Sequence, residues 1–589
     1  MCGIVGYIGN NNAQKKILNT LKKLEYRGYD SAGLSTINND TIETIKESGK
    51  IKKLKSIVNK NKNNSCIGIG HTRWATHGKP NKINSHPHLS YLNNIAIVHN
   101  GIIENYKELK NFLIKNDISF YSETDSEVIA NLICYYYKQT NNKLESIKLA
   151  KNDLIGSYAV CVIFNDDKEN IYGFKLNSPL IIGRNVNENY FVSDIPAIIS
   201  ECKSYIVMND DEIAKIDKNN VYVYDKLLNE KSFKEIKNKY STLNITKIKY
   251  KSYMEKEINE IPTAINDTLN FYKNNCKIIT KLKGKFIGIS NIKIIACGTS
   301  YNAGLMGKYI FESKLNIFTD VIYSSEVNNL EIINPKSTLF IFISQSGETA
   351  DTILALKKIS KLSKKTIGIT NVITSTIASN VNLCMPILAG PEIAVASTKA
   401  YNCQVALLYL ICDIILEKNK LLTYNFNTKR IQNFIKEDLS QKSKEIMKYK
   451  KIFFLGRNLD YNLCKESALK LKEITYINCT EFYSGELKHG PLSLIDKNSL
   501  CIIYCTQKKL IDKTKTLISE IKSRNGNILL ITQFKNEFDE DIILLPLINK
   551  NYVPIIAVIP VQKIALNISK FKHIDPDKPR NLAKSVTVE

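Results

Sequence analysis

The sequence predicts an α/β protein in which a mixed sheet-and-helix domain precedes two copies of a parallel α/β domain. Up to about residue 225, short apolar runs typical of strands alternate with amphipathic stretches such as Ala13–Leu24 and Ser126–Tyr137. From about residue 290 the order becomes apolar run, turn and helix, which predicts parallel sheets with helices on both faces. The segments Lys293–Gly298 and Lys451–Gly456 share one pattern, so we infer a duplication.

Domain boundaries are expected where this pattern and the composition change. Residues 226–250 are rich in Lys and Asn, and an amphipathic helix is expected from Tyr253 to Asn274. Helices near 420–450 would join the two copies. The predicted parts are an N-terminal domain over 2–225, a linker and entry helix over 226–275, the two copies over 276–420 and 440–574, and a tail over 575–589.

The composition indicates a soluble cytoplasmic protein. Of the 589 residues, 44% are hydrophobic and 24% charged, which are ordinary values for a globular protein. The longest apolar helical candidate, Val405–Leu416, is too short to span a membrane and contains Asp413. The first residues lack the long apolar core of a signal peptide. We therefore expect no membrane partner.

The net charge of +25 does not by itself indicate nucleic acid. The lysines are scattered along the whole chain, and a coding bias towards Lys, Asn and Ile explains them as well, so no nucleic-acid partner is expected. The fourteen cysteines include no CxxC pair, which argues against a zinc site or a disulfide framework. Local positive charge is better suited to a phosphate on a small substrate.

Cys2 is the first candidate for chemistry. Removal of Met1 would leave Cys2 with a free α-amine, which titrates near pH ~8 and can act as a base beside the thiol. A chance cysteine at this position is the alternative. Further candidates follow in the same domain.

Three later segments of the N-terminal domain carry polar groups suited to a small amino-acid ligand. His71–Gly78 contains Arg73, whose guanidinium fits a carboxylate, and its histidines favour a structural or ligand-contact function over metal binding. Asn100 and Gly101 end an apolar run and could form an oxyanion hole, although Asn-Gly is also a common turn. Asp125 could bind an ammonium group or cap a helix.

Together these segments resemble the class II, N-terminal-nucleophile glutamine amidotransferases. The matching motifs are Met1–Ile4, Tyr26–Ser31, His71–Gly78, His99–Gly101 and Ser122–Asp125. The resemblance implies an αββα glutaminase fold in which Cys2 attacks the side-chain amide of glutamine and releases ammonia. Arg73 would hold the α-carboxylate, Asp125 the α-ammonium, and Asn100 with Gly101 the oxyanion.

The remaining two thirds suggest a sugar-phosphate site. Ser344–Thr349 lies between an apolar run and a helix, where hydroxyls and backbone N–H groups can cradle a phosphate; capping by Ser and Thr is the alternative. Thr299 and Ser300 follow a neighbouring run and could line the same crevice. Glu473 and His489, from the second copy, are candidate acid/base groups.

The whole chain resembles the isomerising glutamine–fructose-6-phosphate aminotransferases, which join a glutaminase to two sugar isomerase (SIS) domains. The added motifs are Cys297–Ser300, Ser344–Thr349, Val395–Ala400, Gly485–Pro491 and Pro579–Glu589. The resemblance implies conversion of D-fructose 6-phosphate and L-glutamine to D-glucosamine 6-phosphate and L-glutamate, the first step of amino-sugar synthesis. It implies no cofactor and no metal.

The resemblance also implies a function for individual residues. Lys584 would form a Schiff base with the open-chain sugar, Glu473 would move a proton between C1 and C2, and His489 would assist ring opening from the other subunit of a homodimer. Trp74 would gate the ammonia path. The phosphate would be held by Thr299, Ser344, Gln345, Ser346 and Thr349; the sugar would be lined by Ser300, Val395 and Ala396; and Lys470 and Arg580 would support the charge and the tail.

Two other functions stay open from the sequence. A glutaminase could deliver ammonia to another acceptor, although Glu473, His489 and Lys584 would then have no purpose. An SIS-type regulator could bind a sugar phosphate without turnover, but that reading predicts a DNA-binding domain at one end rather than the amide-hydrolysis motifs.

Overall fold

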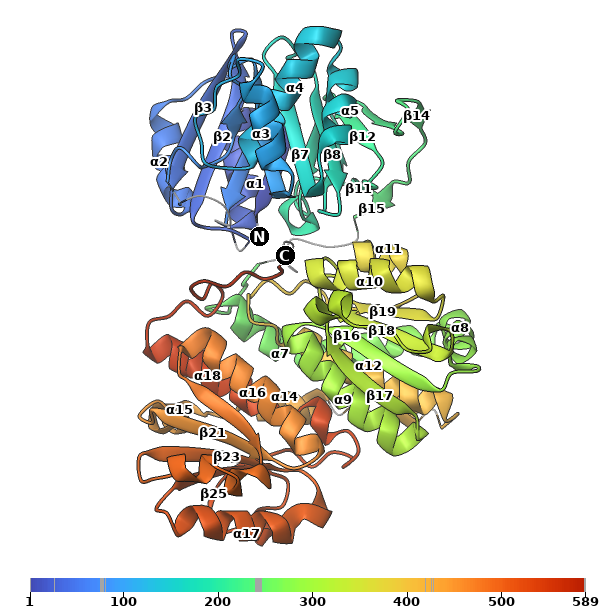
Figure 1. Cartoon of the computed structure of the whole chain (residues 1–589). Coiled ribbons are helices and arrows are strands. Elements are labelled where there is room, and N and C mark those ends of the chain that lie inside the picture. The colour runs from blue at the N-terminus through green and yellow to red at the C-terminus, as the bar shows by residue number, and fades with distance from the viewer. Residues whose placement is uncertain are drawn as a thin grey trace. The chain divides into compact units, whose positions relative to one another are not determined.

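The computed structural model describes residues 2–25, 27–74, 79, 81–238, 246–418, 420–424, 426 and 428–586. The chain divides into two compact units (Figure 1). We call Met1–Thr246 together with Ala583–Glu589 the N-terminal unit, and Lys247–Leu582 the C-terminal unit. Each is described by itself.

The N-terminal unit contains two stacked antiparallel sheets. Within the described residues, the first has the strand order β15-β11-β9-β10-β1-β4-β2-β3 and the second β14-β13-β12-β8-β7-β6-β5. The strands are β1 Gly3–Gly9, β2 Ser31–Asn38, β3 Thr41–Ser48, β4 Ile67–Arg73, β5 His88–Leu89, β6 Ile95–Ile103, β7 Gly156–Phe164, β8 Ile171–Leu176, β9 Ile181–Asn185, β10 Glu188–Val192, β11 Ser204–Val207, β12 Ile213–Ile216, β13 Val221–Tyr224, β14 Glu230–Lys231 and β15 Ile236–Lys237.

Helices cover the outer faces of both sheets. The apolar faces of α1 (Ala13–Leu24) and α2 (Ile51–Lys60) are buried with outer-face residues of the first sheet. Helices α3 (Tyr106–Ile114), α4 (Ser126–Thr140) and α5 (Lys143–Asp153) cover the second. A separate core fills the space between the sheets; it joins Ile4 of β1 to Val98 of β6. The αββα fold class is thereby confirmed.

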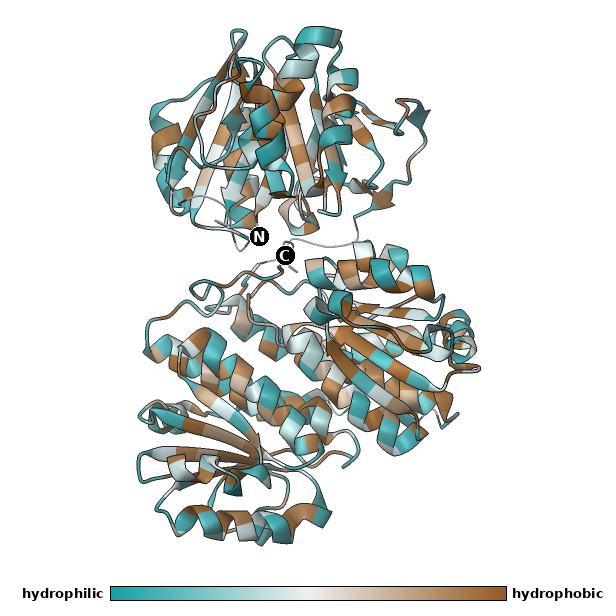
Figure 2. Cartoon of the chain, in the orientation of Figure 1, coloured by the Kyte–Doolittle hydropathy of each residue, from teal (hydrophilic) through white to brown (hydrophobic). Residues whose placement is uncertain are grey.

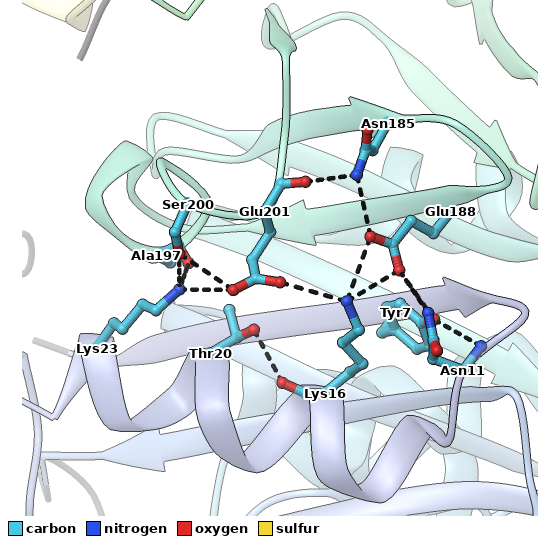
Figure 3. A network of polar contacts seen from close by, with 10 residues as sticks. All are labelled: Tyr7, Asn11, Lys16, Thr20, Lys23, Asn185, Glu188, Ala197, Ser200 and Glu201. Atoms are coloured by element: carbon cyan, nitrogen blue, oxygen red, sulfur yellow. Dashed lines mark hydrogen bonds and ion pairs between the residues drawn. The ribbon is translucent and has the colours of Figure 1, made fainter. Parts of the chain in front are cut away.

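A polar network ties α1 to the first sheet (Figure 3). The Glu188 carboxylate accepts from Tyr7 Oη at 3.2 Å and forms an ion pair with Lys16 at 3.1 Å. Lys16 and Lys23 both pair with Glu201, at 3.3 and 3.0 Å. Burial lowers the pKa of Lys16, but Glu188 and Glu201 outweigh it and raise the pKa above its ordinary value. The network holds β1, which begins directly after Cys2.

The C-terminal unit contains two parallel sheets of identical topology. Over the described residues their orders are β17-β16-β18-β19-β20 and β22-β21-β23-β24-β25. The duplication predicted from the sequence is confirmed. The strands are β16 Asn291–Ala296, β17 Phe318–Tyr323, β18 Thr338–Ser344, β19 Thr366–Thr370, β20 Leu383–Pro386, β21 Lys451–Gly456, β22 Cys479–Tyr483, β23 Ser499–Cys505, β24 Asn527–Thr532 and β25 Asp541–Leu544.

One continuous core joins the two copies. It includes one face of each sheet and the apolar sides of the long helices between them. Figure 2 shows the central strands largely in brown, as expected for strands covered on both faces. The helices are α7 Tyr253–Lys273, α8 Cys276–Phe286, α9 Gly298–Leu315, α10 Ala350–Leu362, α11 Thr376–Asn380, α12 Lys399–Ile415, α13 Lys420–Thr423, α14 Thr428–Lys436, α15 Ser440–Ile446, α16 Leu459–Thr475, α17 Ile511–Lys522 and α18 Ile559–Phe571.

Two segments differ from expectation. Residues 226–238, assigned by composition to a linker, carry β14 and β15, which pair with β13 and β11. Strands of two residues are too short to show an alternating pattern, which explains why the sequence did not reveal them. In the described part of the chain, Val553–Phe571 is the segment long and apolar enough to cross a membrane, and 83% of its 18-residue apolar window is buried inside the protein.

Candidate active sites

Cys2 lies where the start of β1 meets the end of β4. The antiparallel register pairs Gly3 with Thr72, which brings Cys2 beside Trp74. The backbone N–H of Trp74 donates to Cys2 Sγ at 3.3 Å, and the thiol donates to the Trp74 carbonyl at 3.5 Å. Sheet register therefore positions the thiol against the predicted gate residue.

Arg27 is a site residue to which the sequence assigned no function. Its Nε donates to the Cys2 carbonyl at 3.1 Å, and its Nη1 pairs with Asp194 at 2.7 Å. Arg27 is buried, and it anchors the backbone that carries the nucleophile. Its presence in the motif Tyr26–Ser31 was the available signal; Tyr26 itself lies outside the described residues.

Asn100 is oriented towards Cys2 from the facing sheet. Its Nδ2 donates to the Cys2 carbonyl at 3.0 Å, while its Oδ1 lies 3.0 Å from His71 Nε2. Burial lowers the pKa of His71 to about 3, so the ring is neutral, and since Oδ1 can only accept, Nε2 donates. Gly101 has a φ of +129°, and a Cβ there would lie 1.8 Å from the Ser157 oxygen. Only glycine fits this position.

Asp125 and Arg73 are both buried near the thiol. Asp125 precedes α4 but its side chain does not cap that helix; Oδ2 instead accepts from the Ile103 N–H at 2.8 Å. Burial lowers the pKa of Arg73, and the charges of Cys2 and Asp125 oppose that shift. The cluster thus places a cation, a carboxylate, a thiol and an oriented amide together, as binding of a zwitterionic amino acid requires.

Four buried histidines lie behind this cluster. The rings of His71 and His86 stack with centroids 4.2 Å apart, and His86 meets His88 edge-on at 4.6 Å. Burial lowers the pKa of His71, His86, His88 and His99 alike, so all four are neutral. Among the described residues, no group of three His, Cys, Asp or Glu side chains is arranged to hold a metal. Ala75–Gly78 of the predicted motif lies outside those residues.

The predicted phosphate loop lies in the C-terminal unit between β18 and α10. Ser344 Oγ contacts Thr349 Oγ1 at 2.9 Å and accepts from the Gly347 N–H at 3.0 Å. Gly347 has a φ of +67°, and a Cβ would lie 2.0 Å from Ser375 Oγ. Ser346 Oγ accepts from the Glu348 N–H at 3.1 Å, and the Gln345 carbonyl accepts from Asn371 at 3.0 Å. The loop is a tight, preformed turn at a helix N-terminus.

Thr299 and Ser300 lie at the same edge of the sheet, because β16 and β18 are parallel neighbours with Ala296 opposite Ile343. Ser300 Oγ accepts from Gln404 Nε2 of α12 at 3.0 Å. The structure thus brings the start of α9 and the loop Ser344–Thr349 to one edge, although more than 40 positions separate them in sequence.

Lys470 connects this edge to the second copy. Its Nζ donates to Thr299 Oγ1 at 2.9 Å and to Glu473 Oε2 at 2.6 Å. Glu466 lies 3.5 Å from the same ammonium and accepts from Asn302 Nδ2 at 2.8 Å. Burial lowers the pKa of Lys470, but Glu473 and Glu466 raise it above its ordinary value. Burial raises the pKa of Glu466, which the sequence did not single out, to about 7.

The other predicted sugar-site residues are more dispersed. Val395 and Ala396 are buried in the loop between β20 and α12. His489 is exposed at the end of the 3-10 helix η4 (Glu486–Lys488). Arg580 stacks over the Tyr476 ring at 4.2 Å, and its N–H donates to Tyr476 Oη at 2.7 Å. Lys584 is half-buried and belongs to the N-terminal unit.

Known proteins match the whole chain. A glutamine amidotransferase domain matches residues 58–254, and the SIS domain matches 285–412 and 445–566. The glutamine–fructose-6-phosphate aminotransferase (isomerizing) of Caldanaerobacter subterraneus is 41% identical, and that of Clostridium perfringens 38%, each over the full length of both chains. The chain belongs to the family of isomerising glutamine–fructose-6-phosphate aminotransferases.

The family membership extends to solved structures. The C-terminal domain of glucosamine-fructose-6-phosphate aminotransferase from Francisella tularensis is 32% identical, covers 57% of this chain and 99% of its own, and has a TM-score of 0.52. The chain thus combines the glutamine amidotransferase domain and the two SIS domains predicted from the sequence motifs.

Proposed function

We propose that the chain converts D-fructose 6-phosphate and L-glutamine to D-glucosamine 6-phosphate and L-glutamate, the first step of amino-sugar synthesis. The observation that carries this proposal is that one chain holds two sets of groups: Cys2 with Asn100 and Arg73, and Lys470 with Glu473 and Thr299. A glutaminase alone needs only the first set.

In the N-terminal unit, Cys2 is the nucleophile. Its own α-amine, after removal of Met1, takes the thiol proton, and sulfur attacks the side-chain carbonyl of glutamine. Asn100 Nδ2 and the Gly101 N–H stabilise the oxyanion, while Arg73 and Asp125 hold the α-carboxylate and α-ammonium. Ammonia leaves, a thioester forms, and water releases glutamate. Trp74 gates the passage of ammonia.

For the sugar reaction, the loop Ser344–Thr349 and Thr299 hold the sugar phosphate, and Ser300, Val395 and Ala396 line the sugar. Lys584 forms a Schiff base with the open-chain ketose and releases water; ammonia then displaces the lysine amine. Glu473, beside the buried Lys470 ammonium, moves a proton from C1 to C2. One water is consumed in hydrolysis and one released, so the overall reaction balances.

We propose that the chain forms a cytoplasmic homodimer in which His489 assists ring opening from the second subunit. The exposed position of His489 supports this assignment, because a side chain at the surface can reach a neighbouring subunit. Lys470 supports the charge at the sugar site, and Arg580 positions the tail.

The decisive experiment supplies glutamine and fructose 6-phosphate to the purified chain and measures both products. Equal amounts of glutamate and glucosamine 6-phosphate are expected. Glutamate alone would indicate a glutaminase that feeds another acceptor. Binding of the sugar phosphate without turnover would indicate a regulator.

A further inference from the structure

The start of helix α7 is capped by Asp577, which lies near the C-terminal end of the same unit in sequence. The Asp577 carboxylate accepts from the Tyr253 N–H and from the Met254 N–H, both at 2.9 Å. These first two helical amides have no acceptor within the helix. The third, Glu255, donates to Ser252 Oγ at 3.2 Å. A residue 324 positions from Tyr253 therefore completes the cap.

The charge and burial of Asp577 fix its carboxylate at the N-terminus of α7. Asp577 is only 3% exposed, and its carboxylate forms an ion pair with Lys247 at 2.7 Å. The carboxylate also lies at the positive end of the helix dipole. A buried carboxylate needs all of these partners to offset the loss of water, so its position is closely defined.

The main chain of Asp577 holds the predicted sugar loop. Its carbonyl accepts from the Val395 N–H at 3.2 Å. On α7, Glu257 Oε1 accepts from the N–H groups of Ile393 at 2.5 Å and Ala394 at 3.1 Å. The first turns of α7 thus fix both the loop that carries Val395 and the base of the C-terminal tail.

We propose that Asp577 is a positioning residue for the sugar reaction. It fixes the point beside Val395 from which the segment with Arg580 and Lys584 extends. This inference rests on the proposed function, in which Lys584 forms the Schiff base. Misplacement of a reacting group by about 1 Å can cost about 100-fold in rate. Asp577 lies only seven positions before Lys584, so the position of Asp577 affects where the Lys584 amine can lie.

The test compares Asp577→Asn with Ser252→Ala, a matched control that removes a neighbouring cap of the same helix without touching the tail. Asp577→Asn is expected to lower kcat for glucosamine 6-phosphate about 10- to 100-fold. It should slow borohydride trapping of Lys584 with fructose 6-phosphate in parallel. The KM for the sugar should change by less than about threefold, because the phosphate loop is untouched. Ser252→Ala should keep kcat within about twofold.

Further readouts separate a positioning function from a structural one. Sugar-independent glutaminase should be unchanged in Asp577→Asn, and Asp577→Glu, which keeps the charge, should recover part of kcat. An equal loss in Ser252→Ala, or wild-type kcat in Asp577→Asn, would overturn the inference.

Failure of the proposed function gives a different result. If borohydride did not trap wild-type Lys584 with fructose 6-phosphate, the Schiff-base assignment would be wrong. The kcat comparison would still decide whether Asp577 acts on the sugar reaction. If Asp577→Asn does not fold, Lys247→Met takes its place. It removes the ion pair, together with the Lys247 contacts to the Lys251 carbonyl and the Tyr253 ring, and keeps the Asp577 carboxylate. It should lower kcat about two- to fivefold; an unchanged kcat would then overturn the inference.

Discussion

Lys470 Nζ donates to Thr299 Oγ1 at 2.9 Å, although 171 positions separate the two residues. The contact joins α16 of the second copy to the start of α9 in the first. One copy supplies the hydroxyl-rich loop, and the other supplies the buried Lys470 with its half-buried partner Glu473. In the proposed function, these two contributions from the duplicated fold form one sugar site.

Replacement of Lys470 by Met should abolish most sugar chemistry. It removes the ammonium that Glu466 and Glu473 share, and a buried charge without its partner costs about 3–5 kcal/mol. Synthesis of glucosamine 6-phosphate should fall at least about 100-fold, whereas glutaminase without sugar persists. Lys472→Met, on the same helix but partly exposed and paired with Glu481, is the control and should retain activity. Comparable loss in both variants would contradict the assignment.

Replacement of Cys2 by Ala should separate the two reactions. Glutamine-dependent synthesis should disappear because the nucleophile is gone, while isomerisation of fructose 6-phosphate should continue. Cys66→Ala, at an exposed free cysteine, is the matched control and should behave as wild type. Both activities are measured by product formation, and loss of isomerisation together with synthesis would argue against two separate sites.

Asn100→Asp tests the oriented amide. A carboxylate cannot donate a hydrogen bond, so the bond from residue 100 to the Cys2 carbonyl, and the bond proposed to a developing oxyanion, would both be lost. Glutaminase kcat should fall about 10²–10³-fold. Asn105→Asp is the control, because its amide donates to the Asp153 carbonyl and not to Cys2. A similar rate in the two variants would remove Asn100 from the oxyanion site.

Acid should destabilise the N-terminal unit steeply. The pKa values of His71, His86, His88 and His99 are all lowered by burial, to about 3 for His71. Their stabilising effect is fully present above the unfolded pKa of about 6.5 and is lost as the pH falls below it, because only the unfolded state then binds protons. Four histidines that stay neutral in the folded state give a slope of at most about 5 kcal/mol per pH unit.

Trp74, the only tryptophan, reports on this unit, so urea unfolding followed by its fluorescence at several pH values measures the slope. His88→Asn should reduce the slope by about one quarter. A slope that stays the same in this variant would show that His88 is not neutral in the folded protein.

Much of the architecture could be predicted from local pattern. The helix Ala13–Leu24 and the strands that lead into Cys297–Ser300 and Ser344–Thr349 occur where their periodicity and turn residues predict them. The residues of the phosphate loop could be proposed for the same reason, because a strand followed by Ser, Gly and Thr at a helix start is a local signal. By contrast, β14 and β15 are too short to produce a local signal in the sequence.

Site residues defined by distant partners could not be predicted in this way. Arg27 is informative only because it contacts the Cys2 carbonyl, and His71 only because it fixes the Asn100 amide. Glu466 acquires a raised pKa from burial between two copies of one domain. No spacing within the sequence encodes these contacts.

The sequence by itself determined the fold class, the duplication and the family, because strand and helix periods and short motifs are local properties of the chain. Only the tertiary structure decided which groups act on one another. The register of β1 against β4 places Cys2 beside Trp74, the packing of α16 on α9 brings Lys470 to Thr299, and the return of the tail to α7 seats Asp577 beside Val395. Each pairing depends on how distant elements pack, and the free energy of a buried polar contact exists only after that packing has excluded water.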